Sequence, residues 1–419
     1  MPDVDARLDE AVGLALAIGL DVVEKIAFPI REIKPATLFG SGQIEKIGDI
    51  CSLEEAELVV VDGALSAIQQ RNLEEKLGRK VIDRTGLILE IFGERAATAE
   101  GRLQVELAHL DYQAGRLVRS WTHLERQRGG FGFLGGPGET QIEADRRMIR
   151  DRMARLRREL EQVRRTRGLH RERRERAPWP TVALVGYTNA GKSTLFNRLT
   201  GADVMAEDLL FATLDPTMRA IRLPGIAKAV LSDTVGFISD LPTQLVAAFR
   251  ATLEEVTAAD VIVHVRDMAN PQADEQKAQV LGVLSDLGIG AAQDEDENEE
   301  GEGANIPVIE AWNKVDILDS EQRERLESEA ATRSDTVILS ALTGEGLDEL
   351  LDAISVRLTE DARVHRLELP ASDGKRIAWL HAHGEVIEED DSKTADGEPV
   401  RTIAVRLTQR EYGRYESLD

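Results

Sequence analysis

The chain has 419 residues, a formal net charge of −24 and a single cysteine. The length exceeds what one hydrophobic core organises, so we expect about two to four domains. One cysteine excludes an internal disulfide and a cysteine-based metal cluster, which fits a cytosolic protein. No apolar run reaches the roughly 18 residues of a membrane span, and the acidic balance argues against nucleic-acid binding by the whole surface.

Residues 1–97 are predicted to form a small α/β domain. Helical spacing covers residues 5–18 and 64–77, a further helix opens after Gly40-Ser41-Gly42, and extended or apolar runs cover 20–30, 58–62 and 80–82. Strands that alternate with helices predict a small parallel sheet. Without a Lys-Ser pair, the glycines around Ser41 favour a plain helix start over a phosphate cradle. Cys51 is predicted to be a buried thiol, and no metal or nucleophile constellation is visible in these residues.

Residues 98–176 are predicted to form an antiparallel helical hairpin. Apolar residues recur at steps of three and four on both sides of a break, so each helix carries one apolar stripe. The break, residues 129–138, has six glycines in ten residues, which is too many for a helix to continue, so it is the predicted tip. The stripes are Leu103, Leu107, Leu110, Ala114, Leu117, Trp121 and Leu124 before the tip, and Ile142, Ile149, Met153, Leu156, Leu160 and Val163 after it.

The second helix of the hairpin is strongly basic. Residues 143–176 hold 14 arginines against 7 acidic residues, a local net of +7 in an acidic chain. One interpretation is a solvated surface of salt bridges; the other is an arm that lies against a phosphate backbone. Phe131 and Phe133 at the tip are placed either to stack on unpaired bases or to cap the hairpin core. Long arm, basic flank and aromatic tip together favour a reach into structured RNA.

Residues 180–360 are predicted to form the central domain, which opens on a phosphate loop. An apolar run over 182–185 leads into G-x-x-x-x-G-K-S and then into an amphipathic helix. This order predicts a backbone cradle for a phosphate chain at a helix N-terminus. Lys192 is expected on the β and γ phosphates, and the Ser193 hydroxyl on Mg²⁺. The loop residues are Gly186, Tyr187, Thr188, Asn189, Ala190, Gly191, Lys192 and Ser193.

Two further segments are predicted to sense the γ-phosphate. In the first, Thr213 is placed to ligate Mg²⁺ through a loop that orders with a triphosphate. In the second, an apolar run ends in D-x-x-G, where Asp233 holds Mg²⁺ through water and the Gly236 N–H touches the γ-phosphate. The candidate catalytic residues are therefore Lys192, Thr213 and Gly236, and the candidate metal ligands Ser193 and Thr213. The two segments comprise Phe211, Ala212, Thr213, Leu214 and Asp215, and Asp233, Thr234, Val235 and Gly236.

A second pair of segments is predicted to select the base. The Asp316 carboxylate accepts two hydrogen bonds from the guanine N1–H and exocyclic amine, which adenine does not offer, so unpaired acceptors would reject adenine. The backbone of a later strand-end loop can contact guanine O6. Motifs at successive strand ends predict a doubly wound sheet that binds its ligand at the carboxyl edge. The residues are Asn313, Lys314, Val315 and Asp316, and Ser340, Ala341 and Leu342.

Hydrolysis is predicted to be slow without outside help. Phe237 follows D-x-x-G where Ras-type switches have a water-positioning glutamine, and an apolar ring cannot orient water. Asn189 either only tightens the phosphate loop or holds K⁺ that adds positive charge near the phosphates. His264, in a predicted buried strand, is expected to be a core imidazole and not a catalyst. The run 294–302, with seven acids in nine residues, is predicted to be a disordered surface insert.

Residues 361–419 are predicted to form a small α+β domain. Extended runs cover 364–369, 385–388 and 402–407, a helix covers 375–381, and an acidic turn covers 389–398. Nothing in these residues resembles an active site, so a docking module is the expectation.

These motifs together resemble those of the HflX-type ribosome-associated GTPases of the TRAFAC class. The phosphate loop, F-A-T-L-D-P-T, D-T-V-G-F and N-K-V-D carry that family's spacing, as do Asp83-Arg84-Thr85 and residues 101–107 and 136–143. The resemblance is close over about residues 80–360 and looser before them. Two departures stand out: the acidic insert, and a start on a helix where the family usually has a strand. We therefore expect either a first sheet without one edge strand or a chain that begins late.

The resemblance implies a cytosolic, monomeric GTPase that binds the large ribosomal subunit, is activated there, and separates or rescues stalled ribosomes under stress. It implies that the glycine-rich tip points into ribosomal RNA, that GTP lies on the motifs above, and that Mg²⁺ lies on Ser193 and Thr213. Family members are also credited with ATP handling by the N-terminal unit, for which no motif is visible here.

Two other functions stay open on the residues alone. A signalling switch whose hairpin recruits a protein through its apolar stripe would bind with little salt dependence, whereas RNA docking weakens steeply as salt rises. An ATP-dependent kinase or motor is disfavoured by the N-K-x-D segment.

Overall fold

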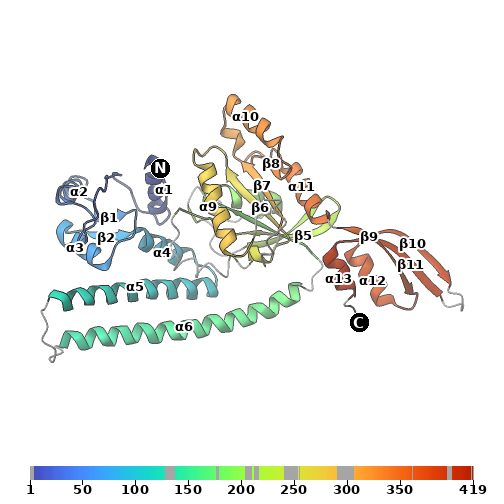
Figure 1. The fold of residues 1–419 in the computed structure, drawn as a ribbon, viewed down its shortest axis with the longest axis horizontal. Helices are drawn as coiled ribbons and strands as arrows, with labels where there is room; N and C mark the ends of the chain where they lie inside the picture. Colours follow the sequence, from blue (N-terminus) through green and yellow to red (C-terminus); the bar gives the residue numbers. More distant parts are fainter. Residues whose placement is uncertain are drawn as a thin grey trace, which may run out of the picture.

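The computed structural model describes residues 4–127, 137–175, 179–202, 210–211, 217–239, 253, 255–289, 306–360, 362–393, 399–416 and 418. An N-terminal domain, a central GTPase-like domain and a C-terminal domain follow one another along the longest axis, and a pair of long helices runs beneath the first two (Figure 1). The predicted multidomain α/β fold is confirmed. Among the described helices, none combines the length and apolar character that a bilayer crossing needs.

The N-terminal domain has a two-stranded parallel sheet. Its elements are α1 (Val4–Leu16), α2 (Ser41–Leu53), β1 (Leu58–Val61), α3 (Ala67–Leu77), β2 (Lys80–Asp83) and α4 (Arg84–Arg95). α3 begins three residues later than predicted because the Ser66 hydroxyl caps it by accepting from the Gln69 N–H. Residues 20–30, predicted to be extended, pair with no strand in the described chain; Pro29 lacks a donor and most side chains there are exposed.

α4, which was not predicted, is the most buried helix of this domain. Leu87, Ile88, Leu89, Ile91 and Phe92 are all buried on it. The Asp83 carboxylate caps it by accepting from the Gly86 N–H, so the helix starts directly where β2 ends. The five apolar residues fall within six consecutive positions and, at 3.6 residues per turn, span an arc of roughly 200°. That arc is wider than the stripe of an ordinary amphipathic helix, and the run is short enough to resemble a buried strand.

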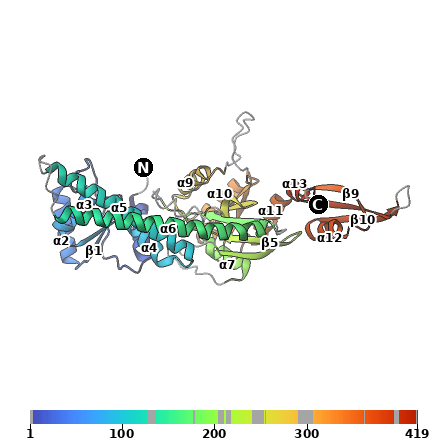
Figure 2. The ribbon, with the colours of Figure 1, turned by 90° about the horizontal axis from the view of Figure 1, so that it is seen from below.

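The hairpin consists of α5 (Ala99–Gln127) and α6 (Pro137–Glu175), which lie side by side and antiparallel (Figures 1 and 2). Met153, Leu156 and Leu160 of the predicted stripe are buried. α5 also buries a second face, with Val105 and Ala108 packed in the cluster that contains α4, and this face was not predicted. Residues 137–138, assigned to the tip, instead begin α6, because proline is tolerated in the first helical turn. The rest of the tip, with Phe131 and Phe133, lies outside the described residues.

The central domain is a doubly wound sheet with strand order β4-β5-β3-β6-β7-β8, parallel except for β4. α7 and α11 pack on one face and α9 on the other. The strands are β3 (Thr181–Gly186), β4 (Thr217–Leu223), β5 (Ile226–Asp233), β6 (Val261–Asp267), β7 (Val308–Asn313) and β8 (Thr336–Ile338). The helices are α7 (Lys192–Thr200), α9 (Ala273–Asp286), η1 (Val315–Ile317), α10 (Ser320–Ala330) and α11 (Leu347–Thr359).

The C-terminal domain is an antiparallel sheet of order β10-β11-β9 with its own core. It contains β9 (Arg363–Pro370), α12 (Gly374–His383), β10 (Glu385–Lys393), β11 (Pro399–Leu407) and α13 (Gln409–Glu416). The acidic turn predicted over 389–398 is wrong for its first half, which continues β10. Arg401 on β11 pairs with Glu389 and Asp391, so the acids are tolerated in the strand. α13 was not predicted.

Candidate functional site

The phosphate loop joins β3 to α7 at the carboxyl edge of the central sheet. Gly186 has φ +152° and Gly191 φ +94°, conformations that side chains rarely adopt. A Cβ on Gly186 would lie 2.2 Å from the Val265 carbonyl oxygen, and one on Gly191 would lie 2.2 Å from Asn313 Nδ2. The glycines therefore let the loop pass against β6 and against the N-K-x-D segment. Asn189 is exposed and left-handed, with φ +59°.

Lys192 is buried at the start of α7, with 5% of its surface exposed. Its ammonium donates to the Tyr187 carbonyl oxygen over 2.7 Å. Burial lowers the pKa of Lys192 to about 8, although the nearby Asp233 carboxylate acts in the opposite direction. A cation held in this low-dielectric position is well suited to pair with a polyphosphate.

Ser193 and Asp233 bring a hydroxyl and a carboxylate together beside this lysine. Asp233 is fully buried at the end of β5, and Ser193 Oγ donates to Asp233 Oδ2 over 2.7 Å. Both supply hard oxygen ligands, the kind that Mg²⁺ prefers, so the residues fit the ion. Within the described chain no group of three or more His, Cys, Asp or Glu forms a protein-only metal site. A Mg²⁺ here would therefore need phosphate and water oxygens to complete its shell.

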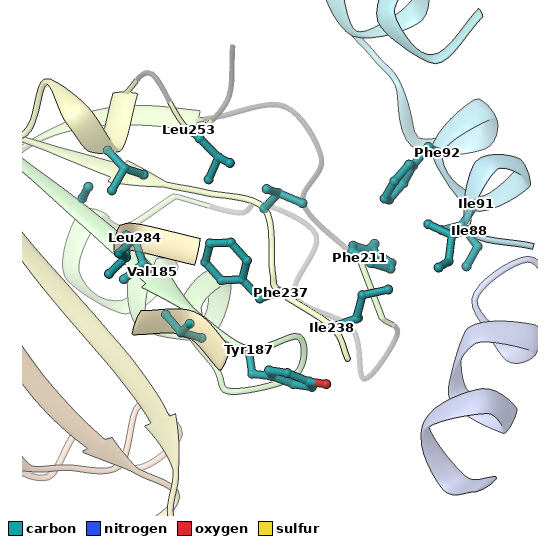
Figure 3. Packing of buried hydrophobic residues seen from close by; sticks show 14 of the residues in the cluster. Ile88, Ile91, Phe92, Val185, Tyr187, Phe211, Phe237, Ile238, Leu253 and Leu284 are labelled. Atoms are coloured by element: carbon teal, nitrogen blue, oxygen red, sulfur yellow. The ribbon is translucent and has the colours of Figure 1, made fainter. Parts of the chain in front are cut away.

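The D-x-x-G segment pairs directly with the phosphate loop. The Thr188 N–H donates to the Phe237 carbonyl over 2.7 Å, and the Phe237 N–H donates to the Gly186 carbonyl over 3.1 Å. A Cβ on Gly236 would lie 2.7 Å from Thr188 Cγ2 and 3.0 Å from Lys192 Nζ, so only glycine fits. The Phe237 ring is buried beside Leu284 in the domain core (Figure 3). Thr234, between these contacts, donates its hydroxyl to a β3 carbonyl, and Val235 is buried.

Asn313 ties the N-K-V-D segment to the phosphate loop. Its Nδ2 donates to the Ala190 carbonyl over 2.8 Å, and its Oδ1 accepts from the Ala341 N–H over 2.9 Å. The Asp316 carboxylate is exposed and accepts from the Ser340 hydroxyl over 2.6 Å. A guanine carbonyl near the Ala341 N–H would share that donor with Asn313.

The remaining predicted residues of this edge take varied positions. Lys314 is left-handed, with φ +68°, and pairs with Asp267 over 2.8 Å. Val315 is buried, whereas Leu342 is exposed. Ala212, Thr213, Leu214 and Asp215 lie outside the described residues, as does the acidic insert 294–302.

Family models match almost the whole chain. They are described as GTP-binding GTPase N-terminal, over residues 5–93, GTP-binding GTPase Middle Region, over 95–174, 50S ribosome-binding GTPase, over 181–314, and HflX C-terminal domain, over 325–417. A protein named GTPase HflX from Magnetococcus marinus is 50% identical over 98% of this chain and 90% of its own length. The chain belongs to the HflX family of GTPases.

A second relative supports the same family. GTPase HflX of Escherichia coli is 44% identical over 92% of this chain and 88% of its own length. Among solved structures, a GTP-binding protein from Sulfolobus solfataricus in complex with GDP is 25% identical, covering 84% of this chain and 95% of that one, with a TM-score of 0.44. Because a TM-score of 0.44 is too low to support a family assignment, the HflX assignment rests on the sequence comparisons.

His264 is buried on β6 of this HflX domain, as predicted. Burial lowers the pKa of its imidazole to about 3, so the ring is neutral at pH 7. Its Nδ1 finds no hydrogen-bond partner among the described residues. Nearby, burial would raise the pKa of Glu310, but hydrogen bonds from Lys277, Trp312 and Arg266 outweigh it and hold that pKa at about 2. This charged cluster joins β6, β7 and α9 inside the domain.

The sequence did not reveal the contacts that join the N-terminal domain to the site. Phe211, with φ +58°, is buried and packs edge-to-face on Phe92 of α4, with ring centroids 4.8 Å apart (Figure 3). Glu10 accepts a hydrogen bond from the Tyr187 hydroxyl, and Arg84 donates one to the Ser239 carbonyl. The D-R-T motif contained Arg84, but the motif alone does not say which distant residue a side chain meets.

Proposed function

We propose that this protein binds GTP and GDP with Mg²⁺, associates with the large ribosomal subunit, and hydrolyses GTP when that subunit stimulates it. The role we propose is the splitting or rescue of stalled ribosomes under stress, in the cytosol where ribosomes are found. The observation that carries the nucleotide part is Asn313, whose amide bonds to both the phosphate loop and the Ala341 loop. Asn313 thereby places the phosphate loop beside the Ser340-Ala341 loop, and Ser340 in turn bonds to the Asp316 carboxylate that we propose selects the base.

In this proposal each motif has a separate role. Lys192 holds the β and γ phosphates, the Gly236 N–H contacts the γ-phosphate, and the Asp316 carboxylate accepts from guanine. Ser193 and Thr213 hold Mg²⁺, with Asp233 bonded to it through water. The ion, when bound, neutralises charge that develops on the transferred phosphoryl group.

Slow intrinsic turnover follows from the position of Phe237. Its ring lies in the core, so the side chain at that position has no polar group to orient a water molecule. The exposed, left-handed Asn189 supports the proposal of a K⁺ ligand near the phosphates. Equal GTP turnover in potassium and sodium buffers would remove the K⁺ part and leave the rest.

The hairpin is the proposed ribosome-binding arm. The family model over the central domain is described as a 50S ribosome-binding GTPase, and the local charge of residues 143–176 is +7. Arg147 and Arg155 on α6 are exposed, where they suit contacts with phosphate. The alternative, a switch that recruits a protein through the apolar stripe of α6, is less favoured because Met153, Leu156 and Leu160 are buried in the folded hairpin.

The test is GTP turnover by the full chain, with and without purified large ribosomal subunits. We expect stimulation of at least about tenfold, since charge stabilisation supplied from outside commonly adds far more than that in GTPases. Unchanged turnover at saturating subunit concentration would overturn the proposal.

The salt dependence of binding to the large ribosomal subunit tests whether the hairpin makes the contact. The double variant Arg147→Gln with Arg155→Gln removes two phosphate contacts. The slope of log affinity for the large subunit against log salt concentration should therefore become less steep by about 2. The matched control changes Arg325, on α10, and Arg333, three residues after its end, to Gln; both are exposed, and the slope should stay unchanged. Equal slopes for the two double variants would exclude this face of α6 from the interface.

A further inference from the structure

The end of β6 lies directly beside the N-K-V-D segment. β6 and β7 are neighbours in the central sheet (Figure 1), and their parallel register sets Asp267 opposite Asn313. One residue further along, the Met268 N–H donates to the Asn313 carbonyl over 3.1 Å. The two strands therefore end in step, and Lys314, the first residue after β7, lies within reach of Asp267, the last residue of β6.

Both oxygens of the Asp267 carboxylate are engaged. Oδ2 pairs with Lys314 Nζ over 2.8 Å, and Oδ1 accepts from the Ala269 N–H over 3.1 Å. The side chain of Asp267 is 15% exposed and that of Lys314 is 24% exposed, so most solvent is kept from the ion pair. Water and salt screen such a pair less than one on an open surface. The carboxylate is thus a fixed anchor for the lysine.

The backbone of Lys314 has the left-handed conformation, with φ +68° and ψ +30°. This conformation is unfavourable for a residue with a Cβ, because the Cβ comes close to the following carbonyl oxygen. Glycine, which has no Cβ, adopts it readily. A side-chain interaction is therefore needed to offset the backbone cost at Lys314, and the ion pair with Asp267 is the contact that the structure shows for it.

The turn at Lys314 decides where Asp316 lies. Lys314 is the N-cap of η1, the single helical turn that carries Asp316. Directly after the turn, Val315 is buried in the cluster around Trp312, whereas Asp316 is exposed and accepts from the Ser340 hydroxyl over 2.6 Å. A right-handed backbone at Lys314 would send the chain in another direction, and the Asp316 carboxylate would leave this position.

We propose that Asp267 is a positioning residue for guanine selection. By holding the ammonium of Lys314, it keeps the backbone of that lysine left-handed and so fixes the direction of the Asp316 carboxylate. This inference rests on the proposed function, in which Asp316 accepts from the guanine N1–H and from the exocyclic amine. A carboxylate that receives two parallel donors must lie in the plane of both, so the pair of bonds demands a stricter geometry than one bond. Asp267 therefore governs how well guanine is distinguished from a purine that lacks the amine.

The experiment compares GDP with inosine diphosphate, whose base keeps the N1–H and lacks the exocyclic amine. Dissociation constants for both are measured by calorimetry on the full-length chain with Mg²⁺. Asp267→Asn keeps an oxygen that can accept from the Ala269 N–H but turns an NH₂ group towards the Lys314 ammonium, so the anchor is lost. We expect the preference for GDP to fall about fivefold, the lower end of what a left-handed backbone costs an L residue when written as an equilibrium ratio.

Two substitutions of Lys314 separate its backbone from its side chain. Lys314→Ala and Lys314→Gly both remove the ammonium and its carbon stem, but only glycine adopts the left-handed conformation readily. The alanine variant should therefore lose preference for GDP as Asp267→Asn does, whereas the glycine variant should keep the preference of the unchanged chain. In the glycine background, Asp267→Asn should have no further effect on the ratio. Equal preferences in the alanine and glycine variants would overturn the proposal, since the lysine would then act through its side chain alone.

Asp274→Asn is the matched control. Asp274 pairs over 2.6 Å with Arg266, the neighbour of Asp267 on β6, so this substitution also removes one ion pair from the end of that strand. The Asp274 side chain is 96% exposed and bonds to no residue of the N-K-V-D segment in the described contacts. The preference for GDP should therefore stay unchanged. A loss as large as that in Asp267→Asn would mean that any weakening of β6 lowers the preference, and the positioning role would be wrong.

The same measurements separate this inference from the proposed function. If the unchanged chain binds GDP and inosine diphosphate equally well, the assigned contact between Asp316 and guanine is wrong, and this inference with it. A strong preference for GDP that survives both Asp267→Asn and Lys314→Ala would overturn the inference alone. Neither result involves ribosomes, so stimulation by the large subunit is tested independently.

Discussion

The N-terminal and C-terminal domains are attached to the GTPase domain in opposite ways. The largest apolar cluster runs without interruption from Leu14 and Phe92 of the N-terminal domain to Phe211, Ile238 and Val185 of the GTPase domain (Figure 3). Among the described residues, by contrast, the core of the C-terminal domain draws only on positions between 367 and 418. The N-terminal flank therefore shares a hydrophobic core with the GTPase domain, whereas the C-terminal flank has a separate core.

This difference predicts different roles for the two flanks. A domain that shares a core with its neighbour cannot shift without changing the packing of both, so it is suited to sense or set the state of the nucleotide edge. A domain with a separate core moves as a rigid body and transmits little, which suits docking.

The largest expected effect comes from one core truncation in each flank. Phe92→Ala and Leu380→Ala each remove a buried side chain and should each cost about 3–5 kcal/mol of local stability. In calorimetry, the transition lowered by Phe92→Ala should be the one that GDP raises, since ligand binding stabilises only the unit that binds it. The transition lowered by Leu380→Ala should not respond to GDP.

Nucleotide affinity is the second readout of this pair. Phe92→Ala should weaken GDP binding, because Phe211 loses its partner ring, whereas Leu380→Ala should leave it unchanged. If both variants lower the same GDP-sensitive transition, the N-terminal and C-terminal domains are equally coupled to the GTPase domain. The proposed difference between the two flanks would then be wrong.

A smaller effect is expected at the Asp316 loop, which is proposed to select the base and touches neither flank in the described contacts. Asp316→Asn should weaken GTP binding at least about 100-fold, because the amide cannot accept both guanine hydrogen bonds. It should favour xanthosine triphosphate, whose carbonyl accepts from the new amide. Asp319→Asn is the control: Asp319 caps α10 and lies outside the motif. Retained GTP preference in Asp316→Asn would contradict the assigned base contact.

Much of the central domain could be predicted because its signals are local. A glycine at positive φ, a strand that ends in aspartate and a lysine at a helix start each state their structural requirement within a few residues, as Gly191, Asp233 and Lys192 do. The doubly wound sheet was then predicted from motifs that stand at successive strand ends.

The contacts between domains could not be predicted, because they are not local. Glu10 and Tyr187 lie 177 residues apart and have no common pattern in the sequence. The apolar residues of α4 form a short, nearly continuous run, so its periodicity does not reveal that Phe92 covers Phe211. The strand that continues through Glu389 was mistaken for a turn because its acids are neutralised from β11, by Arg401.

The smallest expected effect is on the pH dependence of GDP affinity, which reports how far Lys192 of the phosphate loop is shielded from water. With the pKa of free Lys192 at about 8, the ammonium is lost above that pH, whereas a bound phosphate should keep it charged towards the ordinary 10.5. GDP affinity should therefore be independent of this group below about pH 7 and fall by about tenfold per pH unit above pH 8, since binding must then take up a proton. Affinity measured at constant ionic strength checks this slope. Lys192→Arg, which does not titrate in this range, should bind more weakly but without the slope.

Combining this profile with the core variants makes the comparison between the flanks quantitative. Burial is what lowers the pKa of Lys192, and the N-terminal domain packs against the segments that cover it. Phe92→Ala should loosen that cover, readmit water and move the onset of the affinity loss to higher pH. Leu380→Ala should leave the onset in place, because its cavity opens in a separate core. If the affinity loss begins at the same pH in the unchanged chain and in both variants, the GTPase domain alone buries Lys192. The two flanks would then differ only in their effect on stability.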